Sequence, residues 1–161
     1  MPEYMMRLWR SGRCPYLLPA AFYEEEGSLR CRFLTEGLTQ MQPYAFSCPD
    51  GMEDSFFLLL SALESAAFAF GQLQLWLADP AYISLAPQTL YYDRYKQQSV
   101  LSFTIQGDSR PFSVRFQELC SGLGEGGKLI GERLQAFGAG LDLQEKQAAA
   151  FLRTWQQQIR G

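Results

Sequence analysis

Residues 55–78 constrain the fold most, because only one residue among them, Glu64, is charged. Apolar residues recur there at the spacing of one helical face, and further apolar residues widen that face until little polar surface remains. Such a helix is packed on several sides, so the sequence predicts a long helix over residues 53–77 that forms the spine of the fold. The predicted stripe comprises Phe56, Leu60, Leu63, Ala67 and Phe70, widened by Phe57, Leu59 and Phe68.

A membrane span is the alternative interpretation of this segment, because about 20 apolar residues suffice to cross a bilayer. Glu64 lies near the middle of the segment, and Gln72 and Gln74 follow it. Polar groups at those depths are unfavourable in hydrocarbon. The sequence therefore favours a helix inside a globular fold without direct membrane insertion. The opening residues MPEYMMRLWR lack the apolar run of a signal peptide, so a cytoplasmic location is expected.

The first third of the chain is predicted to be rich in strands. Two apolar stretches flank a turn signal at Glu26 and Gly27. In the second stretch, Leu29, Cys31 and Phe33 recur at the period of two expected of a half-buried strand. This pattern predicts an antiparallel hairpin with one solvent-exposed face. Its tip carries three consecutive glutamates, for which simple hydration is favoured over a metal site.

The remaining elements are expected to be short. Residues 5–10 are predicted as a strand, and residues 37–44 as a short helix ended by Pro43. Strand candidates follow the long helix at residues 82–85, 89–92 and 99–105, with a polar turn at residues 94–98. Further helices are expected at residues 112–123, 128–137 and 142–160. At 161 residues, the chain is predicted to be a single α+β domain, residues 1–161, strand-rich over 1–50 and mainly helical over 51–161.

The last of these helices has a capping-box-like start, with Glu145 three residues after Asp142. An apolar stripe runs along it: Ala148, Phe151, Leu152, Trp155 and Ile159. The sequence leaves open whether this stripe docks on the domain or on a partner.

Composition narrows the chemistry that the chain can perform. Histidine is absent, which removes the commonest general base near neutral pH and the commonest metal ligand. Basic residues number 14 against 17 acidic ones and are scattered, whereas nucleic-acid binding requires a clustered basic surface. The cysteines are far apart and contain no C-x-x-C pair, so we expect buried free thiols rather than a redox pair or a zinc site: Cys14, Cys31, Cys48 and Cys120.

A near-match to a phosphate-binding loop, G-x-x-x-x-G-K, runs from Gly122 to Lys128. In a phosphate loop, the residue after the lysine is a serine or threonine that binds magnesium, and a buried strand precedes the loop. Here Leu129 stands at the position of the magnesium-binding serine or threonine, and the preceding segment is predicted to be a helix. We therefore interpret the glycines as a connection between helices, with nucleotide binding as the alternative.

The segment WLADPAYISLAPQTLYYDRYKQQSVLSF resembles a bacterial domain of unknown function that is usually found N-terminal to forkhead-associated domains. Members show an LLDP-x-x-I turn after a helix, then a strand pair ending in an aromatic-rich stretch. The resemblance extends from YLLPAAFYEEEG to about residue 123 and rests on these residues: Leu77, Asp79, Pro80, Tyr82, Ile83, Leu85, Val100, Leu101 and Phe103.

The resemblance implies a reduced protein-kinase-like fold, similar to the cytoplasmic pseudokinase domain of type VII secretion systems. In a kinase, a metal-binding aspartate precedes Phe-Gly, whereas here Ser102 precedes Phe103. The chain also lacks an H-R-D loop and a glycine-rich loop in the N-terminal hairpin. None of its lysines, Lys96, Lys128 and Lys146, lies on the early strands. The resemblance therefore implies a pseudokinase-like scaffold without phosphoryl transfer.

Individual polar residues have a structural and a functional interpretation. Asp79 is expected to form a turn before Pro80, although a kinase keeps its base nearby, and Glu64 is expected at the helix surface or paired with an arginine. Tyr91, Tyr92 and Tyr95 are expected in the core, with a binding groove as the alternative. No catalytic, cofactor-binding or metal-binding residue is assigned.

The expected function is that of a non-catalytic regulatory or interaction module in a bacterial signalling or secretion assembly. Its partner would be a protein, such as a forkhead-associated or secretion component, and not a nucleic acid. The alternative is a nucleotide-binding protein or atypical enzyme that uses the segment from Gly122 to Lys128, or Asp79.

Overall fold

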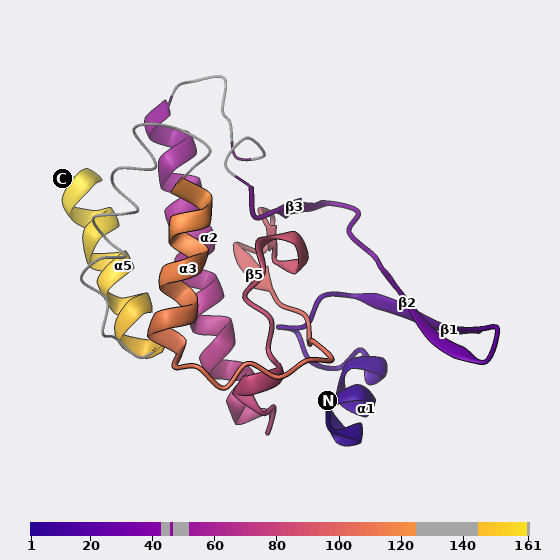
Figure 1. Ribbon diagram of the computed structural model, residues 1–161. Helices are drawn as coiled ribbons and strands as arrows, with labels where there is room; N and C mark the ends of the chain where they lie inside the picture. Colours follow the sequence, from indigo (N-terminus) through magenta and orange to yellow (C-terminus); the bar gives the residue numbers. More distant parts are fainter. Residues whose placement is uncertain (43–45, 47–51, 125–144, 161) are drawn as a thin grey trace.

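The computed structural model describes residues 1–42, 46, 52–124 and 145–160, and the long helix α2 (Met52–Leu75) runs through its middle (Figure 1). The α+β class is confirmed. Along the chain the elements are α1 (Glu3–Ser11), β1 (Ala20–Glu25), β2 (Ser28–Phe33), β3 (Leu38–Gln40), α2, the 3-10 turns η2 (Pro80–Tyr82) and η3 (Pro87–Thr89), β4 (Tyr91–Asp93), β5 (Gln98–Val100), α3 (Phe112–Gly124) and α5 (Glu145–Arg160).

Helix α2 is the spine that its apolar stripe predicts. Leu60, Leu63 and Ala67 are fully buried, and Phe70 is almost fully buried. Phe68 is an exception, because it is half exposed and packs the edge of its ring against Tyr16. The α2 segment is long and apolar enough to cross a membrane by length and composition alone, a test that core helices also pass. Half of the residues in its apolar part, Phe57–Leu75, are buried inside the fold.

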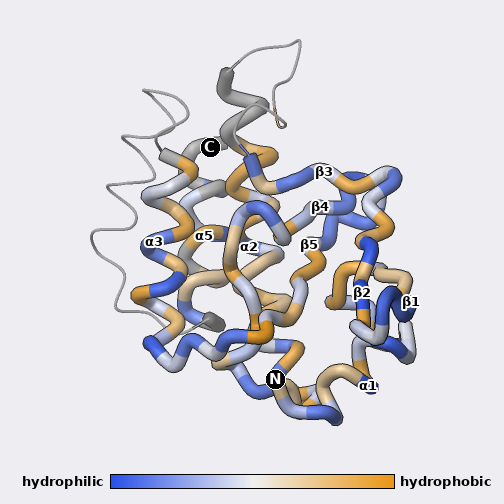
Figure 2. Tube along the Cα trace, turned by 45° about the vertical axis from the view of Figure 1, so that its right-hand side comes forward, coloured by the Kyte–Doolittle hydropathy of each residue, from blue (hydrophilic) through white to orange (hydrophobic). Residues whose placement is uncertain are grey.

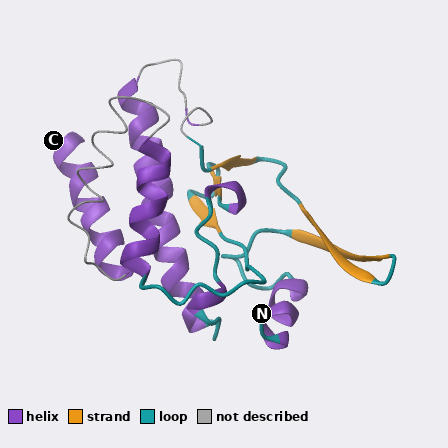
Figure 3. Ribbon diagram, viewed as in Figure 1, coloured by secondary structure: helices purple, strands orange, loops and turns teal. Residues whose placement is uncertain are grey.

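Helices α3 and α5 lie on one side of α2 and the strands on the other (Figures 1 and 3). Helix α5 packs along α2 through Ala148 and Leu152, which are buried, and Arg153 donates a hydrogen bond to Glu64 on α2 at 2.8 Å. The apolar stripe of α5 therefore docks on the fold, as far as its side chains are described. The predicted cap residue Asp142 and the predicted helix at residues 128–137 lie outside the described residues.

The sheet on the other side of α2 has the order β3-β4-β5 and is antiparallel throughout. The predicted strand pair exists as β4 and β5, but its bounds differ: the strands are residues 91–93 and 98–100, where the sequence predicts 89–92 and 99–105. The predicted short helix at residues 37–44 is wrong over residues 38–40, because Leu38 pairs with Asp93 and Gln40 with Tyr91. Gly37 allows this strand to begin with a φ of 77°, a conformation suited to glycine.

Two serines fasten β5 to α2. The backbone N–H of Ser99 donates to the Ser65 hydroxyl at 2.6 Å, and the Ser99 hydroxyl donates to the Ala62 carbonyl at 2.7 Å. Just beyond β5, Leu101 exchanges backbone hydrogen bonds with the segment at residues 16–18. The outer side of this strand region is therefore covered by a helix and by another chain segment.

Strands β1 and β2 form the predicted hairpin, joined by Glu26 and Gly27 at φ values of 52° and 76°. Two positive φ angles fit the type I′ turn that matches strand twist. The hairpin projects from the rest of the fold, and its tip is hydrophilic (Figures 1 and 2). The expected buried face is confined to its base, where Phe22 and Phe33 pack against Trp9. Cys31 is exposed, contrary to the expectation of buried thiols.

The predicted strand at residues 5–10 is wrong, because this segment belongs to helix α1. Met5 and Trp9 lie one helical turn apart and are both buried. The Trp9 indole donates to the Leu18 carbonyl at 2.8 Å, and Gly12 ends the helix in a left-handed conformation. Tertiary burial of this helical face decides the conformation of a segment that also fits a short strand.

The strand candidates at residues 82–85 and 89–92 are only partly confirmed. Ile83 forms a single bridge to Phe103, and the segments before Ile83 and Leu90 are the 3-10 turns η2 and η3. Each of these turns has a proline at its start, which favours a tight turn over a strand. The predicted helix at residues 112–123 is confirmed as α3.

Candidate functional site

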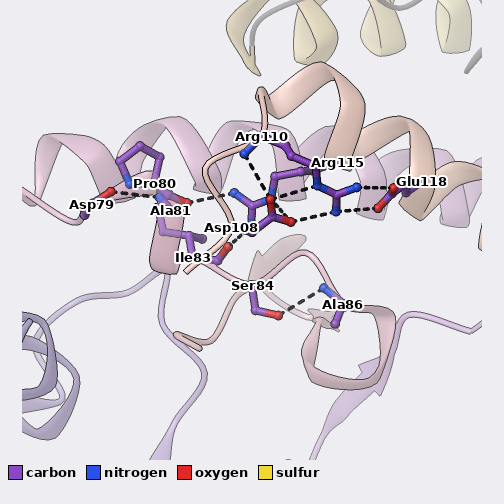
Figure 4. Close-up of polar contacts among 10 residues, drawn as sticks. All are labelled: Asp79, Pro80, Ala81, Ile83, Ser84, Ala86, Asp108, Arg110, Arg115 and Glu118. Atoms are coloured by element: carbon purple, nitrogen blue, oxygen red, sulfur yellow. Dashed lines mark hydrogen bonds and ion pairs between the residues drawn. The ribbon is translucent and has the colours of Figure 1, made fainter. Parts of the chain in front are cut away.

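Four charged residues form an arginine–carboxylate cluster at the start of α3: Asp108, Arg110, Arg115 and Glu118 (Figure 4). Asp108 and Arg110 lie in the connection before the helix. Arg115 and Glu118 lie on the helix itself. Pro111 begins the first turn, where its missing N–H costs nothing, and its carbonyl accepts from the amides of Val114 and Arg115.

Arg110 bridges the two carboxylates of the cluster. Its guanidinium donates to Asp108 at 2.8 and 3.0 Å, and to Glu118 at 2.9 Å and through a second, shorter bond. The backbone N–H of Arg110 also donates to Asp108, at 3.1 Å. Arg110 and Glu118 are about half exposed. The bridge thus lies at the surface and joins the connection to the helix.

Arg115 is the buried member of the cluster, with 6% of its side chain exposed. It donates to the Pro80 carbonyl at 2.9 Å and to the Ile83 carbonyl. Its guanidinium also lies 5.6 Å from the ring centre of Phe70, a cation–π contact. Arg115 therefore ties α3 to the turn that follows α2.

The charges within the cluster are mutually satisfied. Hydrogen bonds from Arg110 hold the pKa of Asp108 at about 2, below its ordinary value. These bonds, together with those to Glu118, raise the pKa of Arg110. Burial lowers the pKa of Arg115, opposed by the charge of Asp108. Two cations face two anions, and the Asp108 carboxyl is ionised at neutral pH. This cluster suits structural pairing better than proton transfer.

Two open cavities adjoin the cluster, and both are lined by Asp108, Arg110 and Arg115. One, of about 800 Å³, extends toward Phe70 and Asp79. The other, of about 620 Å³, extends along the segment at residues 84–87 and along α3. The polar groups that these cavities share are already engaged with one another.

The predicted site residues take structural roles in this geometry. Asp79 accepts a hydrogen bond from the Ala81 amide at 2.9 Å and so caps η2, as a turn former does. It also lines the larger cavity. Glu64 forms an ion pair with Arg153, which agrees with the expectation that it is paired with an arginine. Ser102 is buried, and its hydroxyl has no hydrogen-bond partner among the described residues.

The aromatic and thiol candidates do not converge on a site. Tyr92 is buried, whereas Tyr95 is 96% exposed, so the core prediction is wrong for Tyr95. Cys14 and Cys120 are buried and free, and Cys48 lies outside the described residues. Within the described part of the chain, no group of three acidic or cysteine side chains is placed to hold a metal ion.

The phosphate-loop candidate follows a helix and not a strand. Helix α3 continues through Gly122 to Gly124, which confirms the expected helical context. Lys128 and Leu129 lie outside the described residues. Gly122 also lines the smaller cavity beside the cluster.

Sequence reasoning missed the arginine–carboxylate cluster. The signal that could have found it is Arg115, a single charge next to the apolar positions Phe112, Phe116 and Leu119 of α3. A lone arginine beside a buried face needs acceptors. The carbonyls that it binds lie more than thirty positions away in the sequence, at Pro80 and Ile83.

A second exposed feature lies at the C-terminal end of α2, where Leu75, Trp76 and Leu77 are 74%, 40% and 78% exposed. Leu77 has a φ of 63°. The Leu77 amide donates to the Gln74 carbonyl, and the Ala78 amide donates to the Leu73 carbonyl. These bonds form a Schellman motif, in which the left-handed position is usually glycine.

No protein-family model, curated protein or solved structure matches this chain.

Proposed function

We propose that the chain is a non-catalytic protein-interaction module and that the apolar end of α2, Leu75 to Leu77, is a contact surface for a protein partner. The observation that carries this proposal is the conformation and exposure of Leu77. A left-handed leucine costs about 1–2 kcal/mol relative to glycine, and its exposed side chain gains little burial in return. A residue that is unfavourable on both counts indicates a role outside the fold.

The neighbours of Leu77 extend this surface. Leu75 and Trp76 are exposed beside it, and tryptophan is enriched at protein interfaces. The arginine–carboxylate cluster supports the non-catalytic part of the proposal, because its charged groups are engaged with one another. The resemblance supplies the setting that we propose: a reduced kinase-like fold within a bacterial signalling or secretion assembly, located in the cytoplasm.

The test of this function uses Leu77→Gly, a substitution with opposite expected effects on stability and on binding. Glycine relieves the left-handed strain but adds freedom to the unfolded chain worth about 0.4–1 kcal/mol. The free energy of unfolding should therefore rise by about 0.5–1 kcal/mol. A photo-crosslinking amino acid at position 75 should capture a protein in the native cell, and Leu77→Gly should lower that capture.

A photo-crosslinker at Tyr95 provides the control, because Tyr95 is even more exposed than Leu75 but lies on the β4–β5 turn. Capture that is equal at the two positions, or that survives Leu77→Gly unchanged, would contradict the proposed surface. A rise in melting temperature with ATP and magnesium would instead favour nucleotide binding.

A further inference from the structure

The β1–β2 hairpin has a defined set of unpaired backbone groups. The Leu34 amide donates to the Pro19 carbonyl, and Ala20 lies opposite Phe33. In an antiparallel pair, hydrogen-bonded and non-hydrogen-bonded positions alternate. The amides and carbonyls of β2 at Leu29, Cys31 and Phe33 must therefore point away from β1, along the outer edge of β2.

This edge differs from the other strand edges of the fold. The outer side of β5 is covered by α2 and by residues 16–18, and β3 has only three residues. Helix α1 lies against β1. Strand β2 has six residues and, within the described part of the chain, is paired only with β1. A two-stranded sheet is marginally stable alone, and an added strand would strengthen it.

Side chains on the two faces of β2 define what could pair with it. Arg30 and Arg32 are exposed on one face. Arg30 forms only a 3.5 Å ion pair with Glu25, both side chains being more than half exposed, and Arg32 forms no ion pair within the described residues. The other face carries Leu29 and Cys31, which are also exposed.

We propose that the outer edge of β2 binds an extended segment of a partner protein in which acidic residues alternate with apolar ones. The segment adds a third strand by backbone hydrogen bonds to Leu29, Cys31 and Phe33. Its acidic side chains lie beside Arg30 and Arg32, and its apolar side chains continue the opposite face. This inference rests on the part of the proposed function that makes the chain a protein-interaction module, and it adds the chemistry of a partner.

A second copy of the chain fits this edge poorly. Suppose that β2 of one copy pairs antiparallel with β2 of another through at least two of its outward-pointing residues, Leu29, Cys31 and Phe33. In every such register two arginines lie opposite each other: Arg30 faces Arg30, Arg30 faces Arg32, or Arg32 faces Arg32. Like charges directly opposite each other destabilise a strand pair. The arginines therefore oppose self-pairing, as edge charges commonly do, while attracting an acidic strand.

The experiment uses the full chain, labelled for NMR, and a capped synthetic peptide of alternating glutamate and valine as the probe. Amide exchange should slow at Leu29, Cys31 and Phe33 when the peptide is added, and should not change at Phe22 and Glu24 on the β1 edge. The same peptide methylated on its backbone nitrogens should not slow exchange. Absence of protection, or protection at the β1 edge instead, would overturn the proposal.

Charge reversal tests the specificity of the edge. Arg30→Glu with Arg32→Glu should weaken binding of the glutamate peptide by about two- to thirty-fold, the range expected for two exposed ion pairs. The same variant should bind a lysine–valine peptide better than the native chain does. The control variant, Arg7→Glu with Arg10→Glu on α1, changes the net charge equally at exposed positions and should leave the affinity within about two-fold.

Two further outcomes would overturn the inference. One is equal weakening by the control variant, which would indicate a general charge effect. The other is a dimer of the free chain in which Leu29, Cys31 and Phe33 are already protected, which would assign the edge to self-association. If no peptide binds while capture at position 75 still depends on Leu77, this inference fails and the proposed function stands. The reverse result would reject the proposed contact surface and leave the β2 edge as the binding site.

Discussion

Replacing Arg115 by methionine tests the arginine–carboxylate cluster most directly. Arg115 is the buried member, and it holds the carbonyls of Pro80 and Ile83 from α3. Methionine has a similar length and fills the space beside Phe70, but it cannot donate a hydrogen bond. The substitution therefore removes the arginine's hydrogen bonds to both carbonyls, of which Pro80 keeps only the 3.3 Å bond from the Ile83 amide, while largely preserving the packing.

The expected cost follows from these contacts. Each hydrogen bond from a charged donor contributes about 1.5–3 kcal/mol. Burying the charged guanidinium also costs free energy, and methionine avoids that cost, which offsets part of the loss of the hydrogen bonds. We expect Arg115→Met to lower the free energy of unfolding by about 3–5 kcal/mol, the sum of two such bonds less this offset. For a chain of this size, the melting temperature should fall by about 6–20 °C.

Urea unfolding followed by circular dichroism measures this loss, and a melting curve provides an independent value. Arg110→Met is the matched control, because Arg110 carries the same charge in the same cluster but is half exposed. It should cost clearly less than Arg115→Met. A loss below about 1 kcal/mol for Arg115→Met, or an equal loss for both variants, would refute the idea that Arg115 fastens α3 to the turn after α2.

Three further predictions concern single residues. Leu63 is fully buried on α2, so Leu63→Ala should lower the free energy of unfolding by about 2–5 kcal/mol, measured in urea. The Ser102 hydroxyl is buried without a partner, so Ser102→Ala should raise that free energy by about 1 kcal/mol; a clear loss would reveal a hidden partner. Asp108 has a pKa lowered to about 2 from 3.8. Its contribution should be complete above pH 3.8 and lost as the pH falls through 2, so the stability difference between native chain and Asp108→Asn should shrink only within that window.

The sequence predicts α2 well because its signal is long and its stripe repeats over several turns. Leu60, Leu63 and Ala67 lie on that stripe and are fully buried. The hairpin is also predictable, because Glu26 and Gly27 are a local turn signal. Both features depend on neighbours in the sequence, so they require no knowledge of the tertiary structure.

The sequence is a poor guide to elements whose conformation depends on distant partners. Residues 5–10 fit a strand as well as a helix, and the packing of Trp9 against Phe22, Phe33 and Phe103 selects the helix. Residues 38–40 form a strand only because β4, more than fifty positions later, pairs with them. Short segments have weak intrinsic preferences, and tertiary contacts override them.

The cluster and the apolar end of α2 belong to one mechanical unit. Leu77 lies three positions before Pro80, and the Pro80 and Ile83 carbonyls are held by Arg115 on α3. The left-handed Leu77 is in turn fixed by the hydrogen bonds of Leu77 and Ala78 to the last turn of α2. The exposed leucine is thus restrained on both sides, which lowers the entropic cost of binding a partner.

Loss of Arg115 removes one restraint without altering the surface itself. Arg115→Met should therefore weaken capture at position 75 at temperatures where the variant is still folded, and unchanged capture would show that the end of α2 is held by its own hydrogen bonds alone.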